Sequence, residues 1–256
     1  MVGDLGAVID SVPTREKTLL SVNLQGPDTL LSLLHRAFDR QPVDIDDVAV
    51  PEGDDDLVLL IEDGQVTAVS PMSRLRDTLL LVNVDYYRTG PNVLDEDAIP
   101  DVLAGLSEVE FVVRGFPAST KEKLVLVVVS RLIEARALSA ARGTYHVGFQ
   151  NLSRLDTEYG TRAVHELLAR TSLDIHIYGA RDRRQLVADG LPATIHSSDS
   201  AELHNSWFVV YDPPAGESGH IALVAVQVGD NEWRACWTES PARVDEIMTY
   251  LTETYA

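Results

Sequence analysis

The sequence predicts an α/β fold with a mixed central sheet, a long buried helix and flanking helices. Strand-like apolar runs alternate with segments of helical periodicity, which is the pattern of an α/β protein. Residues 124–129 are apolar without interruption inside a segment with helical signals, and a helix that is apolar on all sides is buried against other elements. Aromatic residues gather in the strand-like segments near the C-terminus, as expected for the core of a sheet.

The N-terminal part is predicted to contain strands joined by helices. The predicted strands are residues 18–24, 57–61, 65–69 and 78–84, and the predicted helices are residues 4–12, 28–38 and a short segment after Pro71. Asp63–Gly64 is the two-residue turn typical of a hairpin, and the acidic stretch 44–56 is predicted to be irregular. Residues 88–101 are acidic and rich in turn formers. We therefore expect an N-terminal α/β region over 1–104 and a C-terminal core over 105–256.

The buried helix is predicted from its ends as well as from its apolar centre. Ser119 with Glu122 three residues later is the signature of a capping box, and Gly143 is the expected C-terminal cap. The β-branched valines lower helix propensity, so tertiary packing must stabilise this helix. A buried strand is the alternative for residues 124–129 alone, but the capping box and the helical pattern after Ser130 favour the helix.

The rest of the C-terminal part is predicted to be mostly strands. These are residues 110–114, 145–149, 173–178, 193–196, 207–211, 221–228 and 233–237, with helices over 153–156, 161–170 and 244–254. Gly229–Asp230–Asn231 predicts a hairpin turn between the last two strands.

The net charge of −19, from 40 acidic and 21 basic residues, points to a particular environment. Self-repulsion among so many carboxylates destabilises a fold at low salt, whereas at molar salt the Debye length falls to about 3 Å. We therefore expect a salt-adapted protein of a salt-in halophile; an ordinary acidic protein of a mesophile is the alternative. Direct nucleic-acid binding is not expected, because the surface repels phosphates and no basic stripe offsets this.

Several classes of protein and site are not expected from the motifs. A single cysteine, Cys236, excludes an internal disulfide, and no apolar run approaches the ~20 residues of a membrane span. No secretion signal is visible at the start, so a cytoplasmic location is expected. His165–Glu166 begins like a zinc-binding H-E-x-x-H, but Ala169 stands where the second histidine is needed. Without a phosphate-binding loop or a nucleophile motif, we expect no metal, no cofactor and no catalytic residue.

Four phrases in order carry a resemblance to a known family. They are SRLIE (130–134), GFQ (148–150), LDIHIYG (173–179) and SWFVVY (206–211), followed by the hairpin over 221–237. Together they resemble the DICT sensory domain, which is associated with diguanylate cyclases and two-component systems, and most closely its stand-alone haloarchaeal members. The resemblance implies an α/β regulatory module that binds a ligand or a partner and has no known catalytic residues.

The candidate ligand-binding residues lie on the buried helix and at strand ends. They are Ser130, Arg131, Glu134, Phe149, Gln150, Tyr178, Gly179, Trp207 and Tyr211. Polar groups on a buried helix need partners, and ligands of α/β sheets bind at strand ends. Each group has an alternative structural interpretation. The three helix residues would form an internal ion pair, Gln150 would cap the next helix, Tyr178–Gly179 would be an ordinary turn, and the aromatic residues would form the sheet core.

We therefore expect a non-catalytic sensory protein that binds a small ligand or a signalling partner and shifts between two states, with a homodimer left open. One alternative is an enzyme with an unrecognised active site; another is an interaction scaffold with an exposed aromatic strand edge over 207–211. From sequence alone, Glu134→Leu is expected to abolish signalling with little loss of fold.

Overall fold

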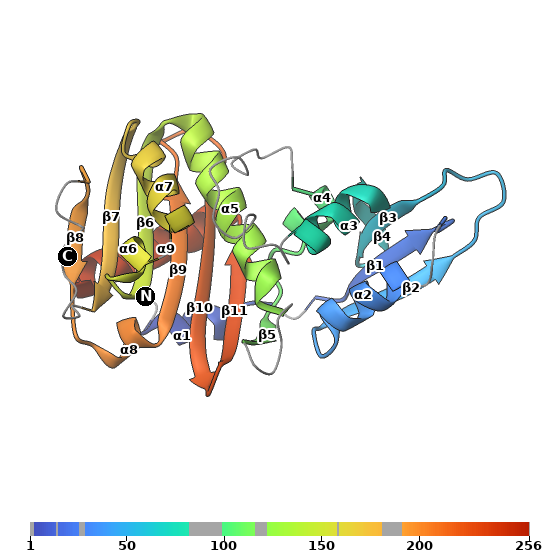
Figure 1. The fold of residues 1–256 in the computed structure, drawn as a ribbon, viewed down its shortest axis with the longest axis horizontal. Coiled ribbons are helices and arrows are strands. Elements are labelled where there is room, and N and C mark those ends of the chain that lie inside the picture. Colours follow the sequence, from blue (N-terminus) through green and yellow to red (C-terminus); the bar gives the residue numbers. More distant parts are fainter. Residues whose placement is uncertain are drawn as a thin grey trace.

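The chain folds into two α/β lobes, each built on its own sheet, as seen in a computed structural model that describes residues 3–13, 15–25, 29–81, 99–115, 122–157, 159–180 and 191–255 (Figure 1). The smaller lobe contains β1 (Lys17–Val22), β2 (Val43–Val48), β3 (Leu57–Glu62) and β4 (Gln65–Pro71), with helices α2 (Thr29–Phe38) and α3 (Met72–Leu81). Its strand order is β2-β1-β3-β4, in which only β1 and β2 are parallel.

The larger lobe is built on a seven-stranded mixed sheet, which confirms the predicted fold class. Its strands are β5 (Phe111–Arg114), β6 (Arg142–Asn151), β7 (Ser172–Ala180), β8 (Thr194–Ser197), β9 (Ser206–Asp212), β10 (Ile221–Gly229) and β11 (Glu232–Thr238). Their order is β5-β11-β10-β9-β6-β7-β8. The pairs β6–β7 and β7–β8 are parallel and the other pairs are antiparallel.

Helices cover both faces of this sheet, so the larger lobe has three layers. The helices are α1 (Leu5–Asp10), α5 (Glu122–Ala140), α6 (Arg154–Thr157), α7 (Tyr159–Leu168), α8 (Ala201–His204) and α9 (Pro241–Tyr255). The short helix α4 (Asp101–Ala104) instead contacts β3 and β4 of the smaller sheet, and it also contacts α5. In Figure 1, α5 and α7 lie in front of the sheet, and α1 and α9 lie behind it. Alternation along β9 divides the core accordingly: Val209 faces α5, whereas Phe208 and Val210 face α1 and α9.

The long helix α5 is buried as predicted. Val125, Leu126, Val128, Val129 and Ile133 all have 3% or less of their surface exposed, although they point in different directions around the helix axis. This burial stabilises a valine-rich helix by removing apolar surface from water, at about 25 cal/mol per Å². The competing interpretation of residues 124–129 as a strand is therefore wrong.

Two predictions for the smaller lobe are wrong. Residues 44–48, expected to be irregular, belong to the parallel edge strand β2, where acidic side chains face water and discourage pairing with another chain. Thr78 to Leu81, expected in a strand, forms the end of α3, whose buried residues Met72, Leu75 and Thr78 recur at helical spacing. Residues 82–84 of that predicted strand lie outside the described residues.

The ends of several C-terminal elements also differ from expectation. Helix α5 ends at Ala140, and Ala141 adopts the left-handed conformation (φ 57°) that was expected of a glycine cap. Gly143 (φ 102°) instead lies in β6, where a Cβ atom would be 2.4 Å from the carbonyl oxygen of Asp212. Ser119 lies outside the described residues, as do residues 88–98 of the expected connection. The last residue of that connection, Asp101, is the first residue of α4. The short helix α8 was not expected.

Polar contacts join the two lobes. Lys17 in β1 donates hydrogen bonds to the carbonyl oxygens of Gly105 and Ser107, at 2.9 and 2.7 Å. The Gln41 amide exchanges two hydrogen bonds with the backbone of Val112 in β5, an edge strand of the larger sheet. Helix α1 is N-terminal but packs on the larger sheet, so the smaller lobe does not contain all of residues 1–104. We keep the domain boundary between residues 104 and 105 as a proposal. Across the described ranges, no helix is both long and apolar enough to cross a membrane.

Candidate functional site

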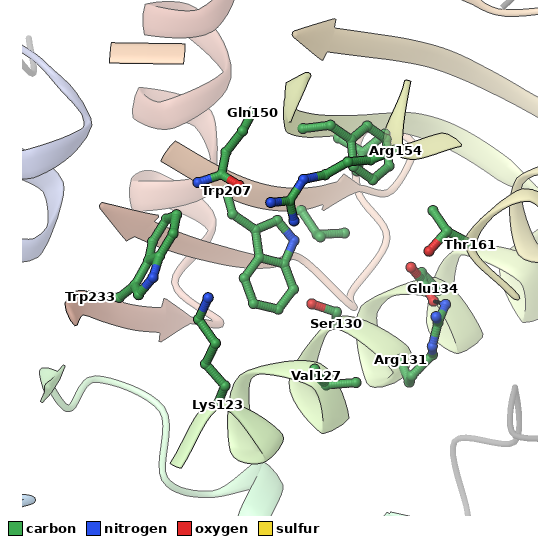
Figure 2. Close-up of a pocket in the computed structure, with 13 residues that line it drawn as sticks. Lys123, Val127, Ser130, Arg131, Glu134, Gln150, Arg154, Thr161, Trp207 and Trp233 are labelled. Atoms are coloured by element: carbon green, nitrogen blue, oxygen red, sulfur yellow. Dashed lines mark hydrogen bonds and ion pairs between the residues drawn. The ribbon is translucent and has the colours of Figure 1, made fainter. Parts of the chain in front are cut away.

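A cavity of about 210 Å³ lies between α5 and the larger sheet (Figure 2). Its walls come from helices α5, α6 and α7 and from strands β6, β9 and β11. The cavity lies where β6 ends and the antiparallel strand β9 begins, because Gly148 pairs with Phe208. This is a strand-end position of the kind that α/β proteins use for ligands.

Helix α5 contributes one stripe of side chains to the cavity. The lining residues of this helix are Lys123, Val127, Ser130, Arg131 and Glu134, which recur at the three- and four-residue spacing of a single helix face. The Ser130 hydroxyl donates a 3.0 Å hydrogen bond to the carbonyl oxygen of Leu126, within the helix. The stripe is polar on a helix that is otherwise buried among apolar residues, so it marks where the core opens.

Arg131 and Glu134 form a buried ion pair at one end of the cavity. The guanidinium donates a hydrogen bond to the Glu134 carboxylate, and the two residues are only 6% and 4% exposed. Breaking a buried pair by removing one partner typically costs about 3–5 kcal/mol. Because the pair is buried, we expect Glu134→Leu to lower the free energy of unfolding by more than the small amount expected from the sequence alone.

Two buried polar groups lie in the core near this ion pair. The electrostatic influence of Glu134 and Arg131 reaches both Tyr145 and His165, whose rings are 6.0 Å apart. Burial lowers the pKa of His165, and its Nδ1 donates a 2.7 Å hydrogen bond to the carbonyl oxygen of Thr161. Its Nε2 and the Tyr145 hydroxyl have no hydrogen-bond partner among the described residues. The sequence analysis considered His165 only as part of an incomplete metal motif and did not consider Tyr145.

A bulge in β6 brings two adjacent residues to the cavity. Gly148 pairs with Tyr178 and Asn151 pairs with Ala180, so β6 has one residue more than β7 at Phe149–Gln150. Regular alternation would place adjacent side chains on opposite faces, whereas here both Phe149 and Gln150 line the cavity. The bulge therefore places an aromatic ring and an amide together at the strand end.

Two indole rings form the aromatic wall of the cavity. Trp207 comes from the start of β9 and Trp233 from β11. The Lys123 ammonium lies over the Trp233 ring, 4.4 Å from its centroid, which is cation–π geometry. Trp233 is 4% exposed, and among the described residues its indole Nε1 has no hydrogen-bond partner. The wall therefore offers the ring surface of Trp233, and the Lys123 ammonium, to an occupant of the cavity.

Six of the nine residues predicted from the sequence line this cavity. They are Ser130, Arg131, Glu134, Phe149, Gln150 and Trp207. Tyr211 shares a face with Trp207, as predicted, but it is buried at the other end of β9, where its hydroxyl donates a 3.1 Å hydrogen bond to the Arg142 carbonyl oxygen. It therefore packs in the core away from the cavity.

Tyr178 lies on the opposite face of the sheet, in a stack of aromatic rings. The stack consists of His146, His176, His196 and Tyr178, with neighbouring centroids 4.4 to 5.6 Å apart. His146 Nδ1 lies 2.8 Å from the Tyr178 hydroxyl, and His176 Nδ1 lies 2.9 Å from His196 Nε2. Burial, reinforced by the two other imidazoles, lowers the pKa of His146 to about 3, so this ring stays neutral at ordinary pH.

Gly179 is close to the cavity but does not line it. A Cβ atom there would lie 2.6 Å from the carbonyl oxygen of Phe149 and 3.1 Å from a Leu152 methyl carbon. The close backbone approach expected of this glycine is therefore present, and it leaves room for the bulge in β6. Gly179 thus supports the placement of Phe149 and Gln150.

The sequence analysis missed several residues of the cavity wall. They are Lys123, Val127, Val147, Arg154, Thr161, Val209 and Trp233. Lys123 lies seven residues before Ser130 on the same helix face, so helical spacing could have found it. Arg154 and Thr161 come from α6 and α7, and no pattern in the sequence predicts that these helices reach the cavity.

The aromatic strand over 207–211 is not an exposed edge, so that alternative is wrong. Strand β9 is paired with β10 on one side and with β6 on the other. Within the described ranges, no group of three His, Cys, Asp or Glu side chains is placed to hold a metal ion. Cys236 is buried, and burial raises the pKa of its thiol to about 12.

Comparison with protein families identifies the segment that contains most of the cavity. Residues 102–227 match the model of the DICT family, described as a sensory domain in diguanylate cyclases and two-component systems. This match confirms the resemblance to the DICT family that the sequence phrases predicted. It extends from α4 into β10 and includes every residue that lines the cavity except Trp233.

Other comparisons add little. No curated protein matches the sequence. Among solved structures, the crystal structure of polyphosphate kinase from Porphyromonas gingivalis is similar over 97% of this chain and 47% of that protein, with 10% identity and a TM-score of 0.36. The chain spans about half the length of that kinase, and similarity at this level does not establish a shared fold or activity.

Proposed function

We propose that this protein is a non-catalytic sensor that binds a small molecule in the cavity between α5 and the larger sheet. The observation that carries the proposal is a cavity of about 210 Å³ whose wall combines the polar stripe of α5 with two indole rings. An engineered cavity of roughly 150 Å³ binds benzene, so this one suits a small ligand. The match of residues 102–227 to a sensory family supports the proposal.

The ligand would act by changing how α5 packs on the sheet. The cavity separates α5 from β6, β9 and β11, so an occupant would contact both layers. At its start, α5 is tied to β5, because the Glu122 carboxylate accepts hydrogen bonds from the Arg114 backbone N–H and guanidinium. A shift of α5 would therefore reach β5, which contacts the smaller lobe through Gln41. We propose that a partner protein senses this shift.

Native mass spectrometry tests the binding of a small molecule. The protein is incubated with the small-molecule fraction of a cell extract, and we expect a bound mass of roughly 100–300 Da, the size that fits such a cavity. Val127→Trp, which fills the cavity from α5, should abolish the adduct. Ser139→Trp, on an exposed position of the same helix, is the matched control and should retain it. No adduct in the wild type, or an equal adduct in Val127→Trp, would contradict the proposal.

We also propose that the protein works in the cytoplasm of a salt-in, haloarchaeal cell, as its net charge of −19 suggests. Screening by salt should relieve the repulsion between carboxylates, so the melting temperature should rise between 0.1 and 2 M KCl. Each kcal/mol of relieved repulsion corresponds to about 2–4 °C in a protein of this size. Circular dichroism in a KCl series measures the shift, and a flat or falling melting temperature would favour the mesophilic alternative.

A further inference from the structure

The walls of the cavity indicate which chemical class of ligand it takes. We infer that the ligand is a compact aromatic molecule with one acidic group, whose ring packs against the indoles and whose anion lies near Lys123 and Arg154. This inference rests on the proposed function, because it names the ligand of the same cavity. Size, charge, hydrogen-bond donors and aromatic surface each support it.

The size of the cavity limits the ligand to one ring or a fused pair of rings. At about 210 Å³, the cavity is somewhat larger than the one of roughly 150 Å³ that holds benzene and smaller than the 300–1,000 Å³ typical of pockets for drug-sized ligands. A cyclic dinucleotide, with two bases and two phosphates, is too large for it.

The charge of the wall favours an anion. Among the described residues that line the cavity, three are cations (Lys123, Arg131 and Arg154) and one is a carboxylate (Glu134), whereas the whole chain has 21 basic and 40 acidic residues. The described part of the wall is thus rich in cations in a protein whose net charge is −19, so this part of the surface favours an anionic ligand more than the rest of the chain does.

The hydrogen-bonding groups near the indoles are mainly donors. The ammonium of Lys123 has three N–H donors and the guanidinium of Arg154 has five, and neither group accepts. In Figure 2, the polar ends of Lys123, Gln150 and Arg154 point toward the Trp207 indole, while Arg131 and Glu134 lie at the other end of the cavity. An acidic group offers several acceptor oxygens, and hydrogen bonds between ionised partners are the strong ones.

The aromatic surface favours a flat ring over an aliphatic one. Trp207, Trp233 and Phe149 all line the cavity. Aromatic pairs contribute about 0.5–1.5 kcal/mol beyond the burial of their area. The ring and the acidic group would thus bind to adjacent parts of the same wall.

Isothermal titration calorimetry with defined probes tests the inference. Indole-3-acetate has a ring and a charge, indole-3-acetamide keeps the ring without the charge, and cyclohexaneacetate keeps the charge without the aromatic ring. We expect indole-3-acetate to bind at least tenfold more tightly than either analogue, and cyclic di-GMP not to bind. Equal affinity for the acid and the amide, or for the aromatic and the aliphatic acid, would overturn the inference.

Variants of residues in the cavity wall show which side chains recognise the acidic group and the ring of the ligand. Lys123→Gln should remove most of the difference between acid and amide, whereas Arg170→Gln, which removes an exposed cation elsewhere, should preserve it. Trp233→Leu removes one aromatic ring from the wall and should weaken binding of the aromatic acid several-fold. A preference unchanged in Lys123→Gln would overturn the assignment of the anion to this residue.

The two proposals fail in different ways. If the cell extract yields an adduct that Val127→Trp abolishes but none of the probes binds, the ligand class is wrong and the sensory cavity stands. If the extract yields no adduct and no probe binds, both proposals are overturned.

Discussion

Glu134→Leu is expected to lower the free energy of unfolding by about 3–5 kcal/mol, the usual cost of removing one partner from a buried ion pair. The substitution leaves the Arg131 guanidinium, which is 6% exposed, without the carboxylate that accepts its hydrogen bond. Arg131→Leu should cost a similar amount, because the Glu134 carboxylate then remains buried. Denaturation by urea measures both.

The double variant measures how strongly the two charges of the ion pair are coupled in the folded protein. Replacing both ends of a buried pair by apolar residues is often neutral, so Arg131→Leu/Glu134→Leu should lose far less than the sum of the single variants. The exposed pair Arg162–Glu166, also on a helix, is the control, and its coupling should stay below about 1 kcal/mol. Additive losses at Arg131 and Glu134 would show that their charges are not coupled in the folded protein.

Acidification is expected to destabilise the protein through His146. Its pKa is about 3 in the folded protein against 6.5 for an ordinary histidine, so the unfolded chain binds the proton more readily. The stabilisation from the neutral ring is therefore present above pH 6.5 and is lost as the pH falls toward 3. At pH 5 the loss from this residue is about 2 kcal/mol. The groups around His146 are His176, His196, Tyr178 and Asp174. Burial, together with the charge of His176 when protonated, also lowers the pKa of His196.

A phenylalanine at position 146 tests this origin of the pH dependence. His146→Phe keeps a stacked ring, and the difference in unfolding free energy between pH 8 and pH 5 should shrink by about 2 kcal/mol. His35→Gln, at an exposed position of α2, should leave that difference unchanged. If the drop in stability persists in full in His146→Phe, the acid sensitivity has another source.

Most of the larger lobe could be predicted because local signals and burial agree there. Alternating apolar residues predicted β7, an aromatic and β-branched run predicted β9, and a hairpin turn predicted the pairing of β10 with β11. The smaller lobe was harder, because β2 alternates acidic with apolar residues at a sheet edge and resembles a loop in composition. Residues 79–81 show the same difficulty, since a short leucine run has no period that distinguishes a strand from a helix.

The cavity could be predicted in part because helical spacing and strand ends are visible in a sequence. Helical spacing predicted Ser130, Arg131 and Glu134, and the position at a strand end predicted Phe149 and Gln150. A bulge and the pairing of distant strands are not visible, so Trp233 and the three-residue step in β6 were not predicted. Tyr178 was misplaced toward the cavity because only its position at a strand end was considered, and not the face of β7 to which alternation assigns it.

The most direct test of ligand binding in the cavity is a crystal structure of the protein after incubation with the small-molecule fraction of a cell extract. Occupation of the α5 cavity predicts non-protein density against Trp207 and Phe149, between α5 and the sheet. A cavity that contains only water, or a bound molecule elsewhere on the protein, would contradict the account.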